Sequence, residues 1–207
     1  KYARSSPSRL SASLSIQDLV NLLDSDDESL AIDAAFTIRG HSDRALIVDD
    51  LIHKLEKSSG EFREQLIATM GYFENAATDA TAYLVEIIQN PDETKWARGY
   101  ALGALGKIGD TDAAQPVVEY MLNHNNPFRD GASWCLQGIA KKHLENSNLT
   151  SLFKTAYMEA LLHETDDLEG RYAKGNIIYS LGELGATEYI DEILGWLKNE
   201  TDPYVIE

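Results

Sequence analysis

Carboxylate side chains recur at equivalent places in the helices that this sequence predicts. They are Asp18, Asp50, Glu86, Glu119 and Glu159, and each lies two residues from positions with core-type side chains. Such residues face away from the core of a helix, and neighbouring helices in a stack lie about 8–10 Å apart. We therefore expect an acidic stripe that accepts N–H groups of a ligand or basic residues of a partner protein. An ordinary solvated helix face explains the same pattern and is the default.

Basic residues occupy a second recurring position. Arg63, Arg98, Arg129 and Lys174 each precede apolar residues three and seven positions further along the chain. Because Arg binds carboxylate groups in a bidentate geometry, Arg98 and Arg129 are candidates for holding an acidic ligand. A structural role is favoured, in which these basic residues pair with acids of the adjacent repeat and keep the stack in register.

Aromatic residues on the predicted helices divide into two groups. Tyr120 and Trp196 align with apolar core positions, so we expect them to pack inside the molecule. Tyr83 and Tyr157 do not, and we expect these two to contact a ligand or partner.

The sequence shows no pattern that identifies a catalytic residue or a metal site. Its lone cysteine, Cys135, lies between Trp134 and Leu136 in a predicted helix, without a neighbour that would lower the thiol pKa. We expect it to be a buried core residue. The five histidines show no metal-ligand spacing, and no phosphate-binding loop or nucleophile motif is present.

The basic positions also mark a repeat. Each opens a first helix, and a second amphipathic helix follows after a break; a weaker copy starts at Ser29 and lacks the basic residue. Successive basic residues lie 35, 31 and 45 positions apart. Two helices in units of this length predict an all-α fold, a right-handed α-solenoid of about five helical hairpins.

The composition limits how the chain can be divided into domains and which kinds of partner it can bind. Residues 1–14 contain several serines and basic residues but no acid, which predicts a flexible tail, and residues 15–207 are expected to form a single repeat domain. The net charge of −16 argues against nucleic acid and anionic membranes as partners. A single cysteine and no long apolar run favour a soluble intracellular protein.

The segment from Arg98 to Asp110, with the sequence RGYALGALGKIGD, resembles the HEAT-like repeat of phycobilisome lyases, as do the looser copies Gly182–Gly185 and Leu136–Gly138. The resemblance spans most of the chain and is more specific for the fold than for an activity. The best-known members of that family, the E/F-type bilin lyases and their chaperone-like relatives, are similar to this chain in size. These proteins attach open-chain tetrapyrroles (bilins) to cysteines of phycobiliproteins, or assist that attachment.

This resemblance implies a function, a ligand and a location. The chain would be a bilin lyase or a related chaperone with a bilin as substrate, a phycobiliprotein subunit as client, and in some cases a partner lyase subunit. It would work in a cyanobacterial cytoplasm or a plastid stroma. In such arrays the second helices line the concave side, so a bilin or client would contact a set of ligand- or partner-binding residues: Asp50, Glu86, Glu119, Glu159, Tyr83, Tyr157, Arg98 and Arg129. The alternative is a non-catalytic adaptor that binds a protein partner in the same groove, and whether the chain is an enzyme stays open.

Overall fold

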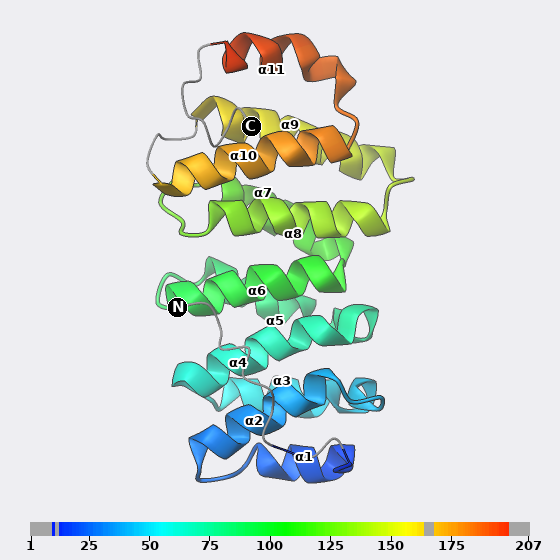
Figure 1. Ribbon diagram of the computed structural model, residues 1–207, viewed down its shortest axis with the longest axis vertical. Coiled ribbons are helices and arrows are strands. Elements are labelled where there is room, and N and C mark those ends of the chain that lie inside the picture. The colour runs from blue at the N-terminus through cyan, green and yellow to red at the C-terminus, as the bar shows by residue number, and fades with distance from the viewer. Residues whose placement is uncertain (1–9, 11–12, 164–167, 199–207) are drawn as a thin grey trace.

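The computed structural model is an elongated stack of helices in two layers (Figure 1). It describes residue 10, residues 13–163 and residues 168–198. Over these ranges every regular element is helical and no strand occurs, which confirms the expected all-α solenoid. The predicted tail falls mostly outside the described residues, although Leu14 packs against the core.

We call the two layers the inner and outer helices. The inner helices are α2 (Glu28–Arg39), α4 (Gly60–Met70), α6 (Lys95–Ile108), α8 (Arg129–Lys142) and α10 (Leu168–Glu183). The outer helices are α1 (Ile16–Leu22), α3 (Val48–Glu56), α5 (Thr81–Gln89), α7 (Ala114–Leu122), α9 (Ser147–His163) and α11 (Ile190–Leu197). The 3₁₀ segments η1 (Arg44–Ile47), η2 (Gly71–Ala80), η3 (Thr111–Ala113) and η4 (Thr187–Tyr189) connect most inner helices to the next outer helix.

The hairpins are paired differently from the sequence prediction. Each outer helix packs against the inner helix that follows it, giving the pairs α1/α2, α3/α4, α5/α6, α7/α8 and α9/α10 within the described ranges, and α11 follows the last pair. The helix with the basic residue therefore closes a hairpin instead of opening one. The weak copy is also displaced by one residue, because α2 buries Ala31, Ala35 and Ile38 and so begins its pattern at Glu28.

Side chains at the helix ends fix where the helices start and stop. Ser15 and Asp18 form a capping box on α1, and the Asp27 side chain accepts hydrogen bonds from the first backbone N–H groups of α2. Thr94 caps α6 in the same way through the Ala97 N–H. At the other end of α6, Gly109 takes a left-handed conformation with φ of 72°, which an L side chain adopts only with strain. These caps define the ends of α1, α2 and α6, whereas α3, α4, α5, α7, α8 and α11 begin without a side-chain cap.

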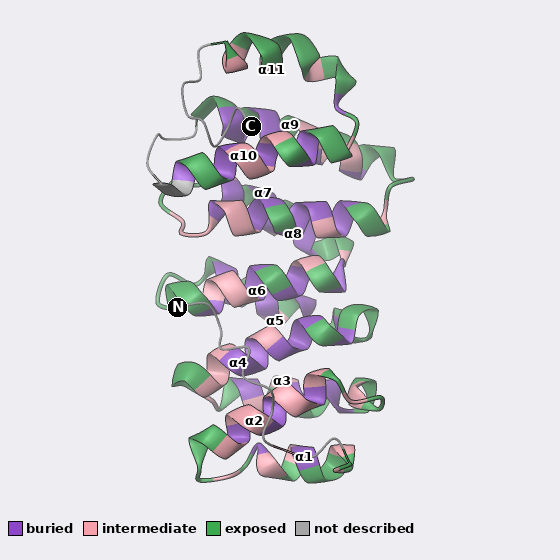
Figure 2. Ribbon diagram, viewed as in Figure 1, coloured by how far each residue is buried: buried purple, intermediate pink, exposed green. Residues whose placement is uncertain are grey.

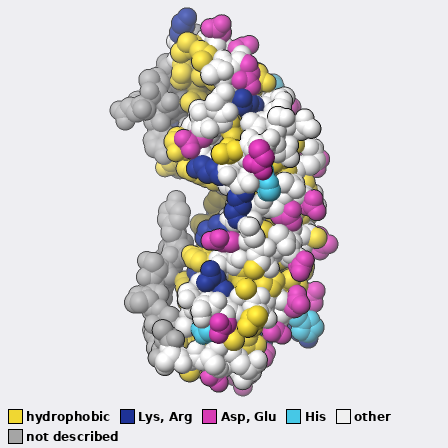
Figure 3. All heavy atoms as spheres, turned by 90° about the vertical axis from the view of Figure 1, so that its right-hand side faces the viewer, with side chains coloured by type: hydrophobic (Ala, Val, Ile, Leu, Met, Phe, Trp, Pro, Cys, Tyr) yellow, Lys and Arg dark blue, Asp and Glu magenta, His cyan; other side chains and the backbone are white. Residues whose placement is uncertain are grey.

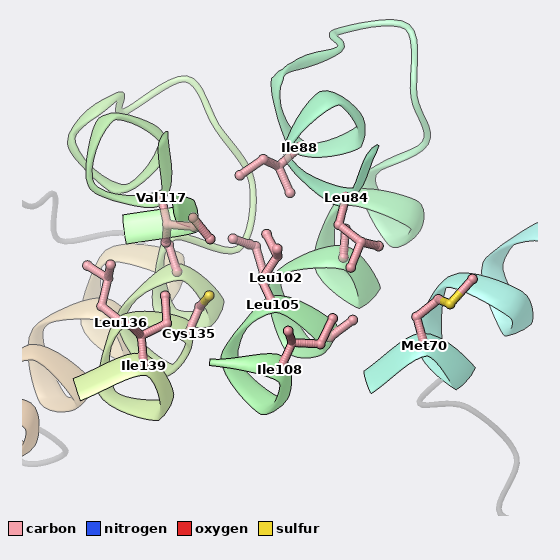
Figure 4. Packing of buried hydrophobic residues seen from close by; sticks show 14 of the residues in the cluster. Met70, Leu84, Ile88, Leu102, Leu105, Ile108, Val117, Cys135, Leu136 and Ile139 are labelled. Atoms are coloured by element: carbon pink, nitrogen blue, oxygen red, sulfur yellow. The ribbon is translucent and has the colours of Figure 1, made fainter. Parts of the chain in front are cut away.

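Aliphatic side chains from both helix layers fill the space between the inner and outer helices. Figure 4 shows Leu102, Leu105 and Ile108 of α6 at the centre of this core, with Leu84 of α5 and Val117 of α7 around them. All five are at most 1% exposed. Figure 2 shows the consequence, since buried positions recur along the stacked helices from α2 to α10, whereas α11 has no buried residue. One continuous core therefore runs along the stack, as repeat architectures require.

Glycines bring the inner helices into backbone contact. A Cβ atom added to Gly106 of α6 would lie 2.9 Å from Cys135 Cα of α8, and one added to Gly138 would lie 2.4 Å from the Gly106 carbonyl oxygen. One helix earlier, a Cβ atom on Gly71 would lie 2.9 Å from Ala104 Cα. We call this line of contacts the glycine seam. Neighbouring outer helices are in less extensive contact than neighbouring inner helices, and no glycine of the described outer helices makes a close contact of this kind.

Closer spacing in the inner layer bends the stack toward that layer. In Figure 3 the outer helices lie on the right, where the outline bulges, so the inner helices form the opposite, concave side. The expectation that the second helices of the sequence repeat line the concave side is therefore wrong. Those helices are the outer ones, and the glycine seam belongs to the other layer.

The glycine seam gives a stability prediction. Replacing Gly106 with Ala should lower the free energy of unfolding by about 1–3 kcal/mol, because the new methyl group meets backbone atoms of α8 that cannot turn aside. Gly103 in the same helix is the matched control, since no atom lies within 4 Å of its Cβ position. Gly103→Ala should raise the free energy of unfolding by about 0.5–1 kcal/mol. Urea denaturation measures both changes, and equal effects of the two substitutions would contradict the close packing.

Candidate functional site

The predicted acidic stripe lies on the convex side of the molecule. Asp18, Asp50, Glu86, Glu119 and Glu159 are all exposed on outer helices. Two of them have local roles: Asp18 belongs to the capping box of α1, and Glu119 accepts a hydrogen bond of 3.0 Å from the Gln115 amide one turn away. These carboxylates are therefore exposed on the outer helices, and Asp50 among them lines a small hollow between α1 and α3 together with Asp24 and Lys54.

The basic residues hold the turns of the hairpins. Arg63 donates a hydrogen bond of 2.9 Å to the Leu55 carbonyl and forms an ion pair with Glu93 in the next hairpin. Burial disfavours the charge of Arg63, but the hydrogen bonds and charge attraction of Glu93 and Tyr83 together outweigh this effect, so the Arg63 pKa is raised. Pairing between repeats, as predicted, is present here.

Arg129 is not available to an acidic ligand. Its side chain is buried, and its guanidinium donates to the His124 carbonyl at 2.8 Å and to the Asn126 carbonyl at 3.4 Å, both in the turn that precedes α8. The prediction that Arg129 binds a ligand is therefore wrong, because Arg129 stabilises the turn of its own hairpin through these hydrogen bonds. Arg98, at the equivalent place in α6, is half-buried.

Tyr157 is buried instead of exposed. None of its surface is accessible, its hydroxyl donates a 2.8 Å hydrogen bond to the Ser133 carbonyl of α8, and burial raises its pKa. Tyr83 is half-buried, and its hydroxyl accepts a hydrogen bond of 3.3 Å from Arg63. Both tyrosines thus serve the packing of the stack, and the prediction of a contact role for Tyr157 is wrong. Tyr120, predicted to be a core residue, is buried.

Cys135 is the buried core residue that the sequence predicts. Figure 4 shows its sulfur atom among the aliphatic side chains between α6 and α8, with Val117 and Leu136 nearby. It is 2% exposed, and burial raises the pKa of the thiol. A thiol that is both inaccessible and protonated is a poor nucleophile.

The most distinctive surface of the concave side is a row of aromatic residues that the predicted binding residues do not include. Trp134 of α8 and Tyr179 of α10 are 50% and 52% exposed, and their ring centroids lie 5.9 Å apart. Toward the other end of the row, Tyr72 is exposed and its ring lies 3.9 Å from the Lys107 ammonium. The signal was present in the sequence, because Trp134 and Tyr179 each stand five residues after a basic position.

The inner helices also differ from the outer helices in charge. α6 and α8 together contain six basic residues and one acid: Lys95, Arg98, Lys107, Arg129, Lys141 and Lys142 against Asp130. The outer helices α5 and α7 contain Glu86 and Glu119 and no basic residue. Figure 3 shows Lys and Arg gathering beside the hollow and Asp and Glu along the bulging side. A chain with strong net negative charge thus has a locally basic concave side.

One hollow at the edge of the stack is occupied by structural bonds. It is lined by residues that include Glu74, Asn75 and Lys142. The Lys142 ammonium donates to Asn75 Oδ1 at 2.6 Å and to the Lys107 carbonyl at 2.6 Å, which ties α8 to α6 and to η2. Lys142 therefore contributes to cohesion between three hairpins.

The fold defines the class of protein as an α-solenoid of helical hairpins. In a comparison with protein families, residues 48–137 match the model for HEAT repeats, a stretch that runs from the start of α3 into α8. A search of the curated proteins gives no significant match. The chain thus contains HEAT-like repeats, which suit a scaffold or adaptor role and commonly mediate protein–protein interaction.

No helix in the described part of the chain is long and apolar enough to cross a membrane. Within the same ranges, no group of three or more His, Cys, Asp or Glu residues is placed to hold a metal ion.

The burial of Cys135 gives a prediction about its reactivity. In the native protein the thiol should react with Ellman's reagent at least about 10³-fold more slowly than in the denatured protein, because labelling requires the α6–α8 contact to open. Time courses of labelling in buffer and in urea measure the two rates. Rapid labelling of the folded protein would contradict the packing around Cys135.

Proposed function

We propose that this chain is an adaptor that binds a protein partner on the concave side of its stack. The observation that carries the proposal is the row of exposed aromatic side chains on the inner helices. Trp and Tyr are enriched where protein surfaces bind each other, because each contributes a large contact area with few rotatable bonds. Trp134 and Tyr179 expose half of their surfaces on a rigid helical layer.

The rigidity of that layer supports the proposal. Trp134 is flanked along α8 by Ser133 and Cys135, which are both buried, and Tyr179 by Ser180, which is also buried. The backbone under the two rings is therefore fixed by the core, and little conformational freedom is lost on binding. Solenoids use extended concave surfaces of this kind for partner binding.

A narrower function is the one implied by the phycobilisome lyase resemblance, in which the ligand is a bilin and the client a phycobiliprotein subunit. One observation favours it. The ring of Tyr72 lies beside both the Arg39 guanidinium and the Lys107 ammonium, so an aromatic surface and cations suited to propionate groups occur together. Arg39 is already committed in part, since it donates to the Gln65 carbonyl and side chain.

Site-specific photo-crosslinking tests the adaptor function. Benzoylphenylalanine placed at Trp134 should form a covalent adduct with one protein in cells of the source organism, because that ring would lie within the interface. The matched control is the same photoreactive residue at Glu119, which is exposed on the convex side. Adducts that form equally at both positions, or at neither, would contradict the proposed surface.

Absorption and fluorescence spectra test the narrower function. Adding phycocyanobilin or phycoerythrobilin to the purified protein should give a sharpened, red-shifted band with new fluorescence if the concave side extends and rigidifies the chromophore. Lys107→Gln should then weaken the shift, because it removes a cation beside Tyr72. Spectra identical to those of free bilin would show that the isolated chain does not bind bilin.

A further inference from the structure

Several glycines of the inner layer are explained by the packing of the molecule, but Gly103 of α6 is not, and Gly182 of α10 is likewise exposed with no atom within 4 Å of its Cβ position. Gly71, Gly106 and Gly138 each lie against backbone atoms of a neighbouring inner helix. Gly103 is in the interior of α6, is exposed, and has no atom within 4 Å of the place where a Cβ would stand. Because glycine weakens a helix interior, a position with open space around it would be better filled by alanine in the isolated chain. The structure offers no internal reason for glycine at this point.

The space at Gly103 lies beside the aromatic row. A Cβ atom on Gly131 of α8 would meet Leu102 of α6 at 3.6 Å, and one on Gly106 of α6 would meet Cys135 of α8. The stretch of α6 from Leu102 to Gly106 therefore runs alongside residues 131–135 of α8. This places Gly103 beside the stretch of α8 that bears Trp134, whose ring contacts Tyr179 of α10, and the exposed backbone of α6 at Gly103 forms a floor next to this pair.

Charge around this floor indicates the chemistry of what would occupy it. Lys107 is exposed one turn beyond Gly103, and Lys141 is exposed at the same end of α8. Lys141 has one acidic neighbour, Glu183 of α10, at 3.5 Å, and both partners of that pair are about half exposed to water. α6 and α8 contain six basic residues and one acid, so these two helices have an excess of positive charge in spite of the negative charge of the chain as a whole, although Arg129 and Lys142 are bonded within the molecule.

We infer that the surface formed by Gly103, Lys107, Trp134, Lys141 and Tyr179 is the docking site for an acidic, extended segment of a partner protein. This inference rests on the adaptor function proposed above and adds the class of partner and the point of closest approach. Gly103 lets the backbone of the segment lie directly on α6, Trp134 and Tyr179 pack against its apolar side chains, and Lys107 and Lys141 attract its carboxylates. The net charge of the chain alone predicts the opposite, a basic partner.

A random-peptide phage library panned on the immobilised full chain tests the inference. Enriched peptides should be rich in Asp and Glu with at least one apolar or aromatic residue, and poor in Lys and Arg. A labelled synthetic copy of the most enriched peptide then gives a dissociation constant by fluorescence anisotropy. Raising the salt from 50 to 300 mM should weaken its binding, because the attraction is between exposed charges.

Three alanine substitutions test whether the peptide binds over Gly103 and Trp134. Gly103→Ala should weaken the peptide by about tenfold or more, although the same substitution stabilises the free protein, so loss of folding is not an explanation. Gly195→Ala is the matched control, because Gly195 is also an exposed helical glycine with open space at its Cβ position, but it lies in α11 of the outer layer. It should leave the dissociation constant within about twofold. Trp134→Ala should weaken binding by about tenfold or more.

The other outcomes separate this inference from the function on which it rests. Enriched peptides rich in Lys and Arg, whose binding is lost in the Glu86→Gln/Glu119→Gln variant and kept in Gly103→Ala, would overturn the inference while leaving an adaptor that binds on its convex side. A dimer in sedimentation experiments that Gly103→Ala dissociates would overturn it in favour of a second copy of the chain. No enriched peptide at all, together with a spectral shift on adding bilin, would overturn both the inference and the adaptor function.

Discussion

The structure depends on backbone contact between inner helices along the glycine seam. At Gly106 and Gly138 the backbones of α6 and α8 come so close that a single methyl group would collide with main-chain atoms. Contacts of this kind hold the inner helices at their closest spacing, while neighbouring outer helices are in less extensive contact. The difference in spacing bends the stack, so the concave side is a consequence of small residues in the inner helices.

Bending decides which side chains can act together. On the concave side, neighbouring helices bring Trp134 and Tyr179 into ring contact, and they bring Lys107 over Tyr72. On the convex side the same geometry separates the exposed carboxylates of the outer helices, so the acidic stripe is spread over a bulging surface (Figure 3). A partner that contacts several repeats at once therefore meets aromatic and basic groups on one side and spaced carboxylates on the other.

Much of the fold could be predicted from the sequence because it is encoded by local spacing. The recurrence of a basic residue with apolar residues three and seven positions later predicts helices and a repeat, and the apolar neighbours of Cys135 predict its burial. Hairpin pairing could not be predicted in the same way, since each helix has a short connection on both sides and only tertiary packing selects the partner. The location of the concave side was missed for a related reason: it follows from distances between backbones, to which Gly106 contributes by lacking a side chain.

The site was predicted less well than the fold. Arg129 and Tyr157 were chosen for their chemistry, but hydrogen bonds to the His124 and Ser133 carbonyls show that the packing of α8 uses both side chains. The aromatic row is visible in the sequence only when positions are compared across repeats, because Trp134 and Tyr179 align with each other and with Gly103. Equivalence between repeats is thus more informative here than residue type.

The central claim is that recognition takes place on the inner helices and not on the acidic outer helices. The most direct test is isothermal titration of the crosslinked partner, once isolated, into the wild-type chain, Trp134→Ala, and the double variant Glu86→Gln/Glu119→Gln. The account predicts that Trp134→Ala weakens affinity by about tenfold or more and that the double variant stays within about twofold of wild type, as expected for exposed charges outside an interface. The reverse result, in which the double variant loses affinity and Trp134→Ala does not, would contradict it.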